Sequence, residues 1–191
     1  SGEVSGRERA NWFWTDFEKA KGKKAEYESS WRRQNWFDYS AAEHMAVRQK
    51  VGMFDMSSFG KIKLIGRDAE AVLQIIAAND VAVPVGKIVY TQFLNDDGHI
   101  EADVTVSRLG LEEFLIVTPA ATIRRDLHWI NGHIPDNAHA IAIDVTVSES
   151  VLVVMGPEAR SFLQPMIPQS LAKDDFAFGT MQQIEIGHAV A

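Results

Sequence analysis

Residues 90–109 read YTQFLNDDGHIEADVTVSRL, and this stretch predicts a β-hairpin around which the rest of the chain is arranged. An apolar strand from Val89 to Leu94 leads into a turn from Asn95 to Gly98. A second strand, Asp103 to Ser107, leaves the turn. Asn, Asp and Gly tolerate the positive φ angles of tight turns, so the turn residues favour a hairpin.

The outgoing strand separates apolar from polar side chains. Because side chains alternate along a strand, Val104 and Val106 share one face, which is expected to meet the core. The opposite face then carries Asp103, Thr105 and Ser107. Aspartate is disfavoured inside strands. Asp103 is therefore either an exposed residue at a strand start or a carboxylate that meets a cationic or proton-bearing ligand, and the pattern leaves both alternatives open.

Length and composition exclude several classes of protein. A chain of 191 residues suits one domain, or one and a half. With 46% hydrophobic residues it can bury a sizeable core, so disorder is not expected. A net charge of −7 argues against binding to nucleic acid, which requires a basic face. Apolar runs are too short for a membrane span, so no membrane association is expected.

The sequence contains no cysteine. Disulfides, thiolate metal ligands and a cysteine nucleophile are therefore excluded. His44 has no ligand partners nearby in the sequence, so no metal site is expected. The lack of cysteine is compatible with a reducing compartment, and we expect a cytoplasmic protein, or one of the mitochondrial matrix in a eukaryote.

Residues 1–38 differ in composition from the rest and are interpreted as an extended lead-in to a domain over residues 39–191. Residues 1–10 are small, polar and charged, which favours flexibility. Two aromatic clusters follow, at residues 12–14 and 31–37. So many large rings in an irregular segment indicate that it is anchored on a surface by them.

Outside the hairpin, the pattern predicts a mixture of helices and strands. Ser40 and Glu43 match a capping box at the start of a helix over residues 40–54. In a later helix, Asp126 is expected near the exposed side. The other expected elements are helices at residues 69–77 and 120–130 and strands at 61–65, 114–117, 141–148 and 182–186.

One pattern occurs twice, ninety residues apart. Residues 61–74, KIKLIGRDAEAVLQ, recur at 151–164 as VLVVMGPEARSFLQ, with Gly, an acid, Ala, Leu and Gln at matching positions. Each copy predicts a strand, a Gly turn and a helix whose positive N-terminus lies near Asp68 or Glu158. Two such units indicate an α+β fold with mixed or antiparallel sheets. The turn lacks the residues of a phosphate loop, so nucleotide binding is not expected there.

Three motifs resemble a known family: residues 51–61 (VGMFDMSSFGK), 89–94 (VYTQFL) and 101–109 (EADVTVSRL). The family is that of the aminomethyltransferases, which includes the glycine cleavage T-protein. With residues 35–37 (NWF) and 43–48 (EHMAVR), the Ser-Ser-Phe-Gly-Lys segment most resembles the folate-binding region of dimethylglycine and sarcosine dehydrogenases or oxidases. The similarity covers nearly the whole chain.

The resemblance implies a partial aminomethyltransferase folate-binding fold with an internal β-α repeat. It also implies one-carbon transfer from a methylated or aminomethyl amine to tetrahydrofolate, forming 5,10-methylenetetrahydrofolate. Asp103 stands where the family places its central carboxylate, so it is the expected catalytic residue. The expected folate contacts are Tyr90, Thr105, Phe59, Val117 and Thr118.

The chain departs from the family pattern at several positions. The family's turn carries Gly-Gly where this chain has Gly98-His99. His99 is either a pH-sensitive ligand contact or, as we expect, a solvent-exposed turn residue. Pro119 stands where the family often has an Asn beside the pterin. A single acid, Asp103, follows Ala102 where T-proteins carry paired acids.

The chain ends before the Tyr-x-Gly-Glu segment and the later arginine that complete the family's folate pocket. A dinucleotide-binding Gly-x-Gly-x-x-Gly motif is also missing from the sequence. We therefore expect a truncated part of a larger enzyme, in which any FAD belongs to a separate or missing domain.

Two hypotheses follow. In the first, the chain is the one-carbon transferase part of an enzyme, with a small-molecule amine substrate and a flavin dehydrogenase domain or partner. In the second, it is a non-catalytic fragment or docking module of the same fold. An exposed sheet edge near Ile184 would favour a homo-oligomer in either case.

Overall fold

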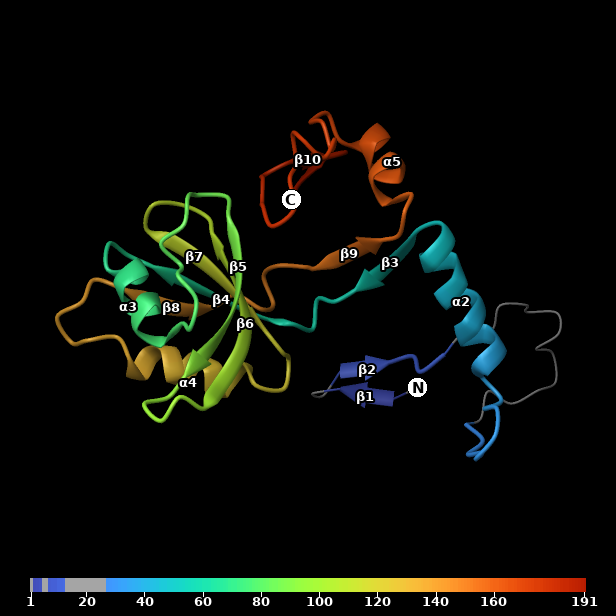
Figure 1. Cartoon of the computed structure of the whole chain (residues 1–191), viewed down its shortest axis with the longest axis horizontal. Helices are drawn as coiled ribbons and strands as arrows, with labels where there is room; N and C mark the ends of the chain where they lie inside the picture. The colour runs from blue at the N-terminus through green and yellow to red at the C-terminus, as the bar shows by residue number, and fades with distance from the viewer. Residues whose placement is uncertain (1, 5–6, 13–26) are drawn as a thin grey trace. The chain divides into compact units, whose positions relative to one another are not determined.

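Five antiparallel strands form the central sheet of the computed structural model, which describes residues 2–4, 7–12 and 27–191 (Figure 1). Their order across the sheet is β5, β6, β7, β4 and β8. Their bounds are β5 Ile88–Leu94, β6 Ile100–Arg108, β7 Glu113–Thr118, β4 Gly60–Ile65 and β8 Ile141–Asp144.

The predicted hairpin is confirmed as β5 and β6. Gly98 adopts a φ of 78°, the left-handed conformation that glycine enters at no steric cost. The Asn95 side-chain oxygen accepts hydrogen bonds from the backbone N–H groups of Asp97 at 3.1 Å and His99 at 2.9 Å. The turn residues therefore close the hairpin by the chemistry that their sequence predicts.

The core lies on one face of this sheet, beneath α3 (Ala69–Ile76) and α4 (Ile123–Gly132) (Figure 1). Val104 and Val106 point into it, as their alternation predicts. Burial of each large aliphatic or aromatic side chain contributes about 1.5–3 kcal/mol, so this layer stabilises the fold. Other core residues are Ile62, Leu64, Val72, Leu73, Ile76, Phe93, Phe114, Ile116 and Ile130.

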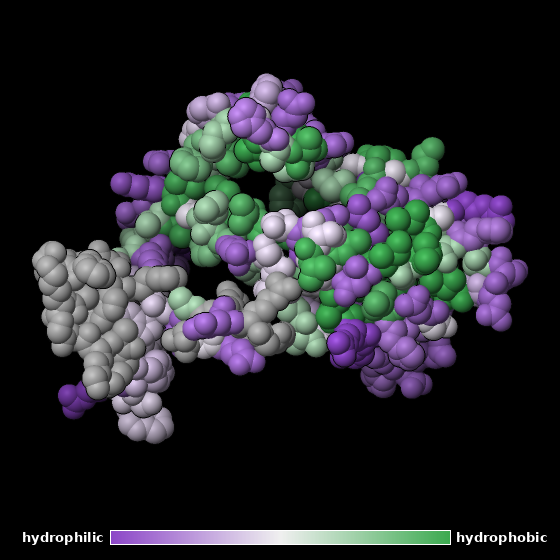
Figure 2. All heavy atoms as spheres, turned by 180° about the vertical axis from the view of Figure 1, so that it is seen from behind, coloured by the Kyte–Doolittle hydropathy of each residue, from purple (hydrophilic) through white to green (hydrophobic). Residues whose placement is uncertain are grey.

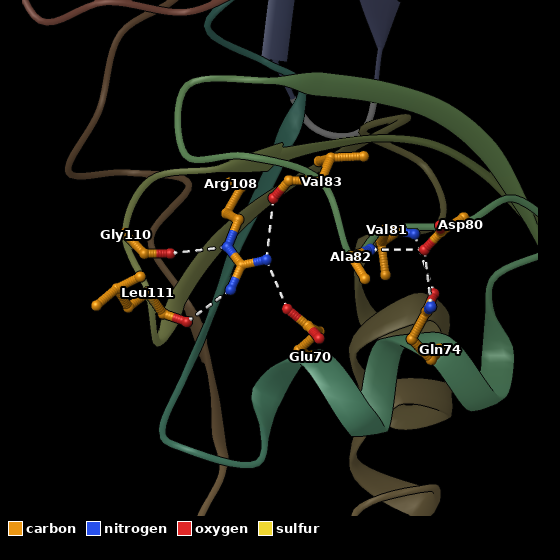
Figure 3. Close-up of polar contacts among 9 residues, drawn as sticks. All are labelled: Glu70, Gln74, Asp80, Val81, Ala82, Val83, Arg108, Gly110 and Leu111. Atoms are coloured by element: carbon orange, nitrogen blue, oxygen red, sulfur yellow. Dashed lines mark hydrogen bonds and ion pairs between the residues drawn. The ribbon is translucent and has the colours of Figure 1, made fainter.

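Arg108, at the end of β6, fixes the position of α3 (Figure 3). Its guanidinium pairs with Glu70 of α3 at 2.5 Å. The same group donates hydrogen bonds to the backbone carbonyls of Val83 at 2.9 Å, Gly110 at 3.3 Å and Leu111 at 3.1 Å. One planar donor group thus holds a helix and two connections to the end of the central hairpin.

The internal repeat is confirmed in three dimensions. β4 and α3 form its first copy, and β9 (Leu152–Met155) and α5 (Ala159–Leu163) form its second. Both turns have a glycine with positive φ, 135° at Gly66 and 125° at Gly156.

The repeat also extends beyond the matching sequence. The Gln74 side-chain oxygen accepts the backbone N–H of Val81 at 2.9 Å (Figure 3), and that of Gln164 accepts the N–H of Leu171 at 2.8 Å. The glutamine therefore has the same role in both copies: its side chain binds the backbone seven residues later and fixes the segment that follows the helix.

The chain divides into two units, residues 55–152 with 164–191, which contain the central sheet, and residues 1–54 with 153–163. In the second of these, β1 pairs with β2, and β3 pairs with β9. Among its described residues, this unit also contains α2. The bounds are β1 Gly2–Val4, β2 Arg7–Arg9, α2 Phe37–Gln49 and β3 Gly52–Asp55.

The N-terminal segment differs in part from its expected form. β1 and β2 lie within residues 1–10, which were expected to be flexible. Trp12 packs against Tyr39 with ring centroids 5.3 Å apart, as an anchoring ring should. Trp31 is instead fully exposed, so it anchors nothing. The rest of the first aromatic cluster, residues 13–14, lies outside the described residues.

The helix expected at residues 40–54 is wrong at both ends. α2 begins at Phe37, so Ser40 lies inside its first turn, and no side-chain hydrogen bond caps the helix. Residues 52–54 belong to β3 instead. Strand pairing with β9 outweighs the local helical pattern there, because β3 gains a hydrogen-bonded partner from a distant segment.

Other helices and strands also begin or end at residues different from those predicted. α4 begins at Ile123 rather than at residue 120, because Pro119 to Thr122 form a turn closed by a hydrogen bond of 3.1 Å. β8 ends at Asp144, whose side chain accepts the N–H of Thr146 at 2.9 Å and turns the chain. The remaining short elements are η1 Gln164–Met166, β10 Glu185–Ile186 and β11 Ala189–Val190.

The last predicted strand, residues 182–186, is reduced to β10, which pairs with β11. Backbone hydrogen bonds in both directions join Ile184 to Ala191, at 2.8 and 2.9 Å. The segment near Ile184, where an exposed sheet edge was expected, is therefore paired on one side.

The surface of the unit with the central sheet is mixed in polarity. Seen from behind, hydrophobic patches lie between hydrophilic ones (Figure 2). Exposed apolar side chains include Leu111, Ile141, Ile143 and Val147. Within the described ranges, no helix is long and apolar enough to cross a membrane.

Candidate functional site

The sheet face opposite the helices brings most of the predicted site residues together. Tyr90 of β5 lies directly opposite Thr105 of β6, and Thr105 lies opposite Val117 of β7. These three residues form one row across three adjacent strands. Gln92 and Asp103 form the next row toward the turn. The alternation that buries Val104 and Val106 places all of these side chains on the same face.

Asp103 is exposed, and both of its carboxylate oxygens are engaged. The Tyr90 hydroxyl donates to Oδ2 at 3.0 Å, and the Gln92 side-chain amide donates to Oδ1 at 3.1 Å. Both donors are neutral, so the negative charge of the carboxylate is not cancelled by an ion pair with either of them. A carboxylate held in this way can still attract a cation or accept a proton.

The hydrogen bond to Asp103 changes the acidity of Tyr90. It raises the pKa of the Tyr90 hydroxyl above its ordinary value, because loss of the proton would break the bond and place two negative charges side by side. Tyr90 is 62% exposed. It therefore presents a flat apolar surface beside the carboxylate, and its hydroxyl stays protonated at neutral pH.

The hairpin turn borders this face. The Asn95 amide donates to Glu101 at 3.1 Å and braces the start of β6. His99 is exposed in the turn, as we expect for a turn residue.

Thr118 is not brought to this face. It is the residue after Val117, so its side chain points to the helix-covered side, where it is buried. Its hydroxyl donates to the carboxylate of Asp126 in α4, and the Thr122 hydroxyl donates to the same oxygen at 2.6 Å. Asp126 is fully buried, so its expected place near the exposed side of the helix is wrong. The threonine hydroxyls compensate the carboxylate for its loss of water.

Phe59 lies at the end of the sheet. It precedes β4 by one residue, is half-buried, and its backbone N–H donates to the Met56 carbonyl at 3.0 Å. The next residue but one, Lys61, lies opposite Val117. Phe59 is thus close in the chain to the strand that borders the site.

Gln92 and Lys61 are two residues of this face that sequence reasoning missed. The pairing of Gln92 with Asp103 could not be predicted, because it depends on a β-bulge between Phe93 and Leu94. A regular ladder counted from the turn would place Gln92 opposite Ala102. Lys61 is buried, and its ammonium donates to the Ser57 carbonyl at 3.0 Å. Lys61 alternates with Ile62 and Leu64 in the sequence, which places it on the face away from the core, but no sequence signal indicates that it is covered.

Among the residues that the structure describes, no group of three or more His, Asp or Glu side chains could hold a metal ion. The polar groups of this face include the Asp103 carboxylate, the Tyr90 phenol, the Gln92 amide, the Thr105 hydroxyl and the buried ammonium of Lys61.

Known proteins resemble this chain in sequence. The family described as the GCVT N-terminal domain matches residues 1–191. A 4-methylaminobutanoate oxidase (formaldehyde-forming) from Paenarthrobacter nicotinovorans is 40% identical over 98% of this chain, and the match covers 22% of the oxidase. The mitochondrial dimethylglycine dehydrogenase of Mus musculus is 34% identical over 91% of this chain, which covers 19% of that enzyme. The chain thus spans about a fifth of the length of these relatives.

The fold also matches a solved structure. The aminomethyltransferase T of the glycine cleavage system from Bartonella henselae superposes with a TM-score of 0.67 at 20% identity. The superposition covers 86% of this chain and 45% of that one. This likeness confirms the α+β fold class predicted from the sequence. Since the family match extends over all 191 residues, the chain belongs to the GCVT N-terminal domain family.

Proposed function

We propose that the sheet face around Asp103 binds tetrahydrofolate. In this proposal, the chain is the one-carbon transfer part of a larger enzyme that resembles dimethylglycine or sarcosine dehydrogenase, or the T-protein. The observation that carries the proposal is the exposed Asp103 carboxylate, held between Tyr90 and Gln92 on an open sheet face.

The side chains of this face suit a flat, partly polar ligand. Tyr90 offers an exposed ring, Val117 an apolar contact and Thr105 a hydroxyl, all in one row. With Phe59 at the end of β4, these residues are the proposed ligand contacts. The Thr118 hydroxyl is engaged by Asp126, so we assign Thr118 the role of anchoring the end of β7.

Asp103 is the proposed catalytic residue. When bound, tetrahydrofolate supplies the nucleophilic nitrogens that accept the one-carbon unit, which yields 5,10-methylenetetrahydrofolate. The Asp103 carboxylate stabilises positive charge on an amine or iminium group and accepts or returns its proton. Tyr90 and Gln92 leave that charge in place, because neither carries a positive charge of its own.

The amine substrate and its oxidation are assigned to the larger protein. The relatives are named as an oxidase and a dehydrogenase, and this chain covers only about a fifth of them. We therefore propose that a flavin domain or partner, holding FAD, oxidises the small amine and delivers its one-carbon unit to this region. Within the chain, we assign folate binding to residues 39–191, with residues 1–38 leading into them.

Calorimetric titration of the chain with folinic acid, a stable folate, tests the proposal. Saturable binding is expected, and Asp103→Ala should weaken it by about tenfold to a hundredfold, since a hydrogen bond to a charged group is worth about 1.5–3 kcal/mol. Asp96→Ala is the matched control, because Asp96 is an exposed aspartate in the turn of the same hairpin. It should bind like the wild type.

A longer protein that continues past residue 191 separates the remaining outcomes. Binding by the longer protein alone would assign the pocket to the whole enzyme. If neither protein binds folinic acid, the folate proposal is wrong, and a docking module becomes the better description of this fold.

A further inference from the structure

Gln92 contacts the proposed catalytic carboxylate, although a glutamine in a strand gives no indication of such a role. It lies directly opposite Asp103 in the β5–β6 ladder, and its amide donates to Oδ1 of that carboxylate at 3.1 Å. The Tyr90 hydroxyl occupies the other oxygen at 3.0 Å. An exposed aspartate on a strand samples more than one rotamer unless its neighbours restrain it. Two donors on different oxygens fix both the direction and the plane of the carboxylate.

The backbone of Gln92 is itself fixed. β5 is an edge strand of the sheet, but residues 77–79 run along its outer side. The Gln92 carbonyl accepts the N–H of Ala78 at 2.8 Å, and Phe93 forms a bridge with Ala77. On the preceding residue, the buried Thr91 hydroxyl accepts the N–H of Asn79 at 3.0 Å. The amide of Gln92 is thus presented by a strand that is bonded on both sides.

The β-bulge explains why these two residues meet. It lies between Phe93 and Leu94, and beyond it the ladder is shifted by one residue, so that Gln92 pairs with Asp103 rather than with Ala102. Bulges re-aim side chains next to functional sites. Here the shift puts the long neutral amide of Gln92, rather than Thr91, across from the exposed carboxylate.

We propose that Gln92 is a positioning residue that holds the Asp103 carboxylate in one orientation for the ligand. The proposal rests on the folate-binding function assigned above. Glutamine meets the requirement because its amide reaches across the ladder and donates without neutralising the carboxylate. Asparagine is one methylene shorter, and lysine would form an ion pair that competes with a cationic substrate.

The coupling among the three side chains extends to Tyr90. The Asp103 hydrogen bond is the main cause of the raised pKa of the Tyr90 hydroxyl, and the Gln92 side chain acts in the opposite direction. A change at Gln92 is therefore expected to alter the acidity of Tyr90 as well as the orientation of Asp103.

Gln92→Met tests the proposal, since methionine keeps the length and removes the donor. Three-bond NMR couplings of Asp103 should report one χ1 rotamer in the wild type and averaging in Gln92→Met. Affinity for folinic acid should fall about fivefold to tenfold in the same variant. Gln169→Met is the control, because Gln169 is an exposed glutamine outside the sheet, and both readouts should match the wild type.

Gln92→Glu provides a second test, the pH dependence of folinic acid affinity. This dependence would not change if Gln92 had only a structural role. At neutral pH the introduced carboxylate repels Asp103 and weakens binding. On acidification, one proton shared by the two carboxyls restores a donor, so affinity should recover relative to Gln92→Met. A single Asp103 rotamer in Gln92→Met would overturn the proposal, and so would a Gln92→Glu profile without acid recovery.

The outcomes distinguish this inference from the proposed function. Lack of folinic acid binding by the wild type and by the longer protein would overturn the folate assignment. The rotamer measurement would still decide whether Gln92 positions Asp103, because it requires no ligand.

Discussion

At the scale of single residues, the hydrogen bond from Tyr90 to Asp103 makes the tyrosine a reporter of the site. We predict that Asp103→Ala lowers the pKa of the Tyr90 hydroxyl toward its ordinary value of 10.0, because the acceptor that retains the proton is lost. Ultraviolet titration at alkaline pH measures the ionisation, and Tyr90→Phe identifies which of the 3 tyrosines contributes.

The sign of the pH dependence follows from the direction of the shift. Folding raises the pKa of Tyr90, so the folded state favours the protonated hydroxyl. The associated stabilisation is complete below the ordinary pKa of 10.0 and is lost as the pH rises through the higher folded value. Asp103→Ala should therefore flatten the decline of stability in this alkaline range. Tyr90 ionisation that is identical in both proteins would contradict the assignment.

The buried Asp126 is a second residue whose role can be measured. Asp126→Ala leaves the hydroxyls of Thr118 and Thr122 without their shared acceptor. We predict a loss of about 1–3 kcal/mol in the free energy of unfolding, because the buried Thr118 hydroxyl loses its acceptor and a buried unsatisfied polar group costs about that much. Urea denaturation measures the change. Asp136→Ala, at an exposed loop position, should stay close to the wild type, and equal stability of the two variants would disprove the anchor.

At the scale of elements, the glycine in the hairpin turn and the glycine in the turn of the first repeat copy have different surroundings. A Cβ at Gly66 would collide with the backbone carbonyl of His139, whereas one at Gly98 would meet nothing within 4 Å. Both glycines have positive φ. We predict that Gly98→Ala costs about 1–2 kcal/mol from the backbone conformation alone.

Gly66→Ala should cost clearly more, about 3 kcal/mol or above, because backbone atoms cannot move aside as a flexible side chain can. The two variants form a matched pair, and thermal or urea unfolding of each provides the comparison. Equal losses would show that the collision at Gly66 is relieved by a small shift.

The elements that sequence reasoning found are those with local causes. The hairpin follows from Asn95 and Gly98, and the β-α repeat follows from the Gly, acid, Ala, Leu and Gln that recur at matching positions. β3 was missed because its strand character depends on β9, about a hundred residues away in the chain. Asp126 was predicted near the exposed side of its helix. The hydroxyl of Thr118, which hydrogen-bonds the buried carboxylate, lies on another element, so the sequence of the helix alone does not indicate the burial.

The same distinction applies to the site. Alternation and the family resemblance predicted Tyr90, Asp103, Thr105 and Val117, and the structure places these four on one face. The hydrogen bond from Gln92 could not be predicted, since the bulge that aligns it with Asp103 has no signature in the sequence.

At the scale of the whole molecule, the two copies of the repeat bury very different amounts of apolar surface. Ile62 and Val72 of the first copy are 0% and 2% exposed. Their counterparts ninety residues later, Leu152 and Phe162, are 59% and 53% exposed. The first copy is covered by the central sheet and α4, whereas the second has apolar residues at the same positions without an equivalent cover among the described residues.

This imbalance predicts self-association of the isolated chain. Exposed apolar surface at these positions favours contact between copies of the chain. Phe162→Lys should weaken the association, because it places a charge within the apolar surface. Val147→Lys is the control, since Val147 is equally apolar and 90% exposed but lies outside the repeat. Sedimentation velocity over a concentration series measures the effect. A wild-type chain that remains monomeric throughout, or an equal effect of both lysines, would show that the second copy does not drive association.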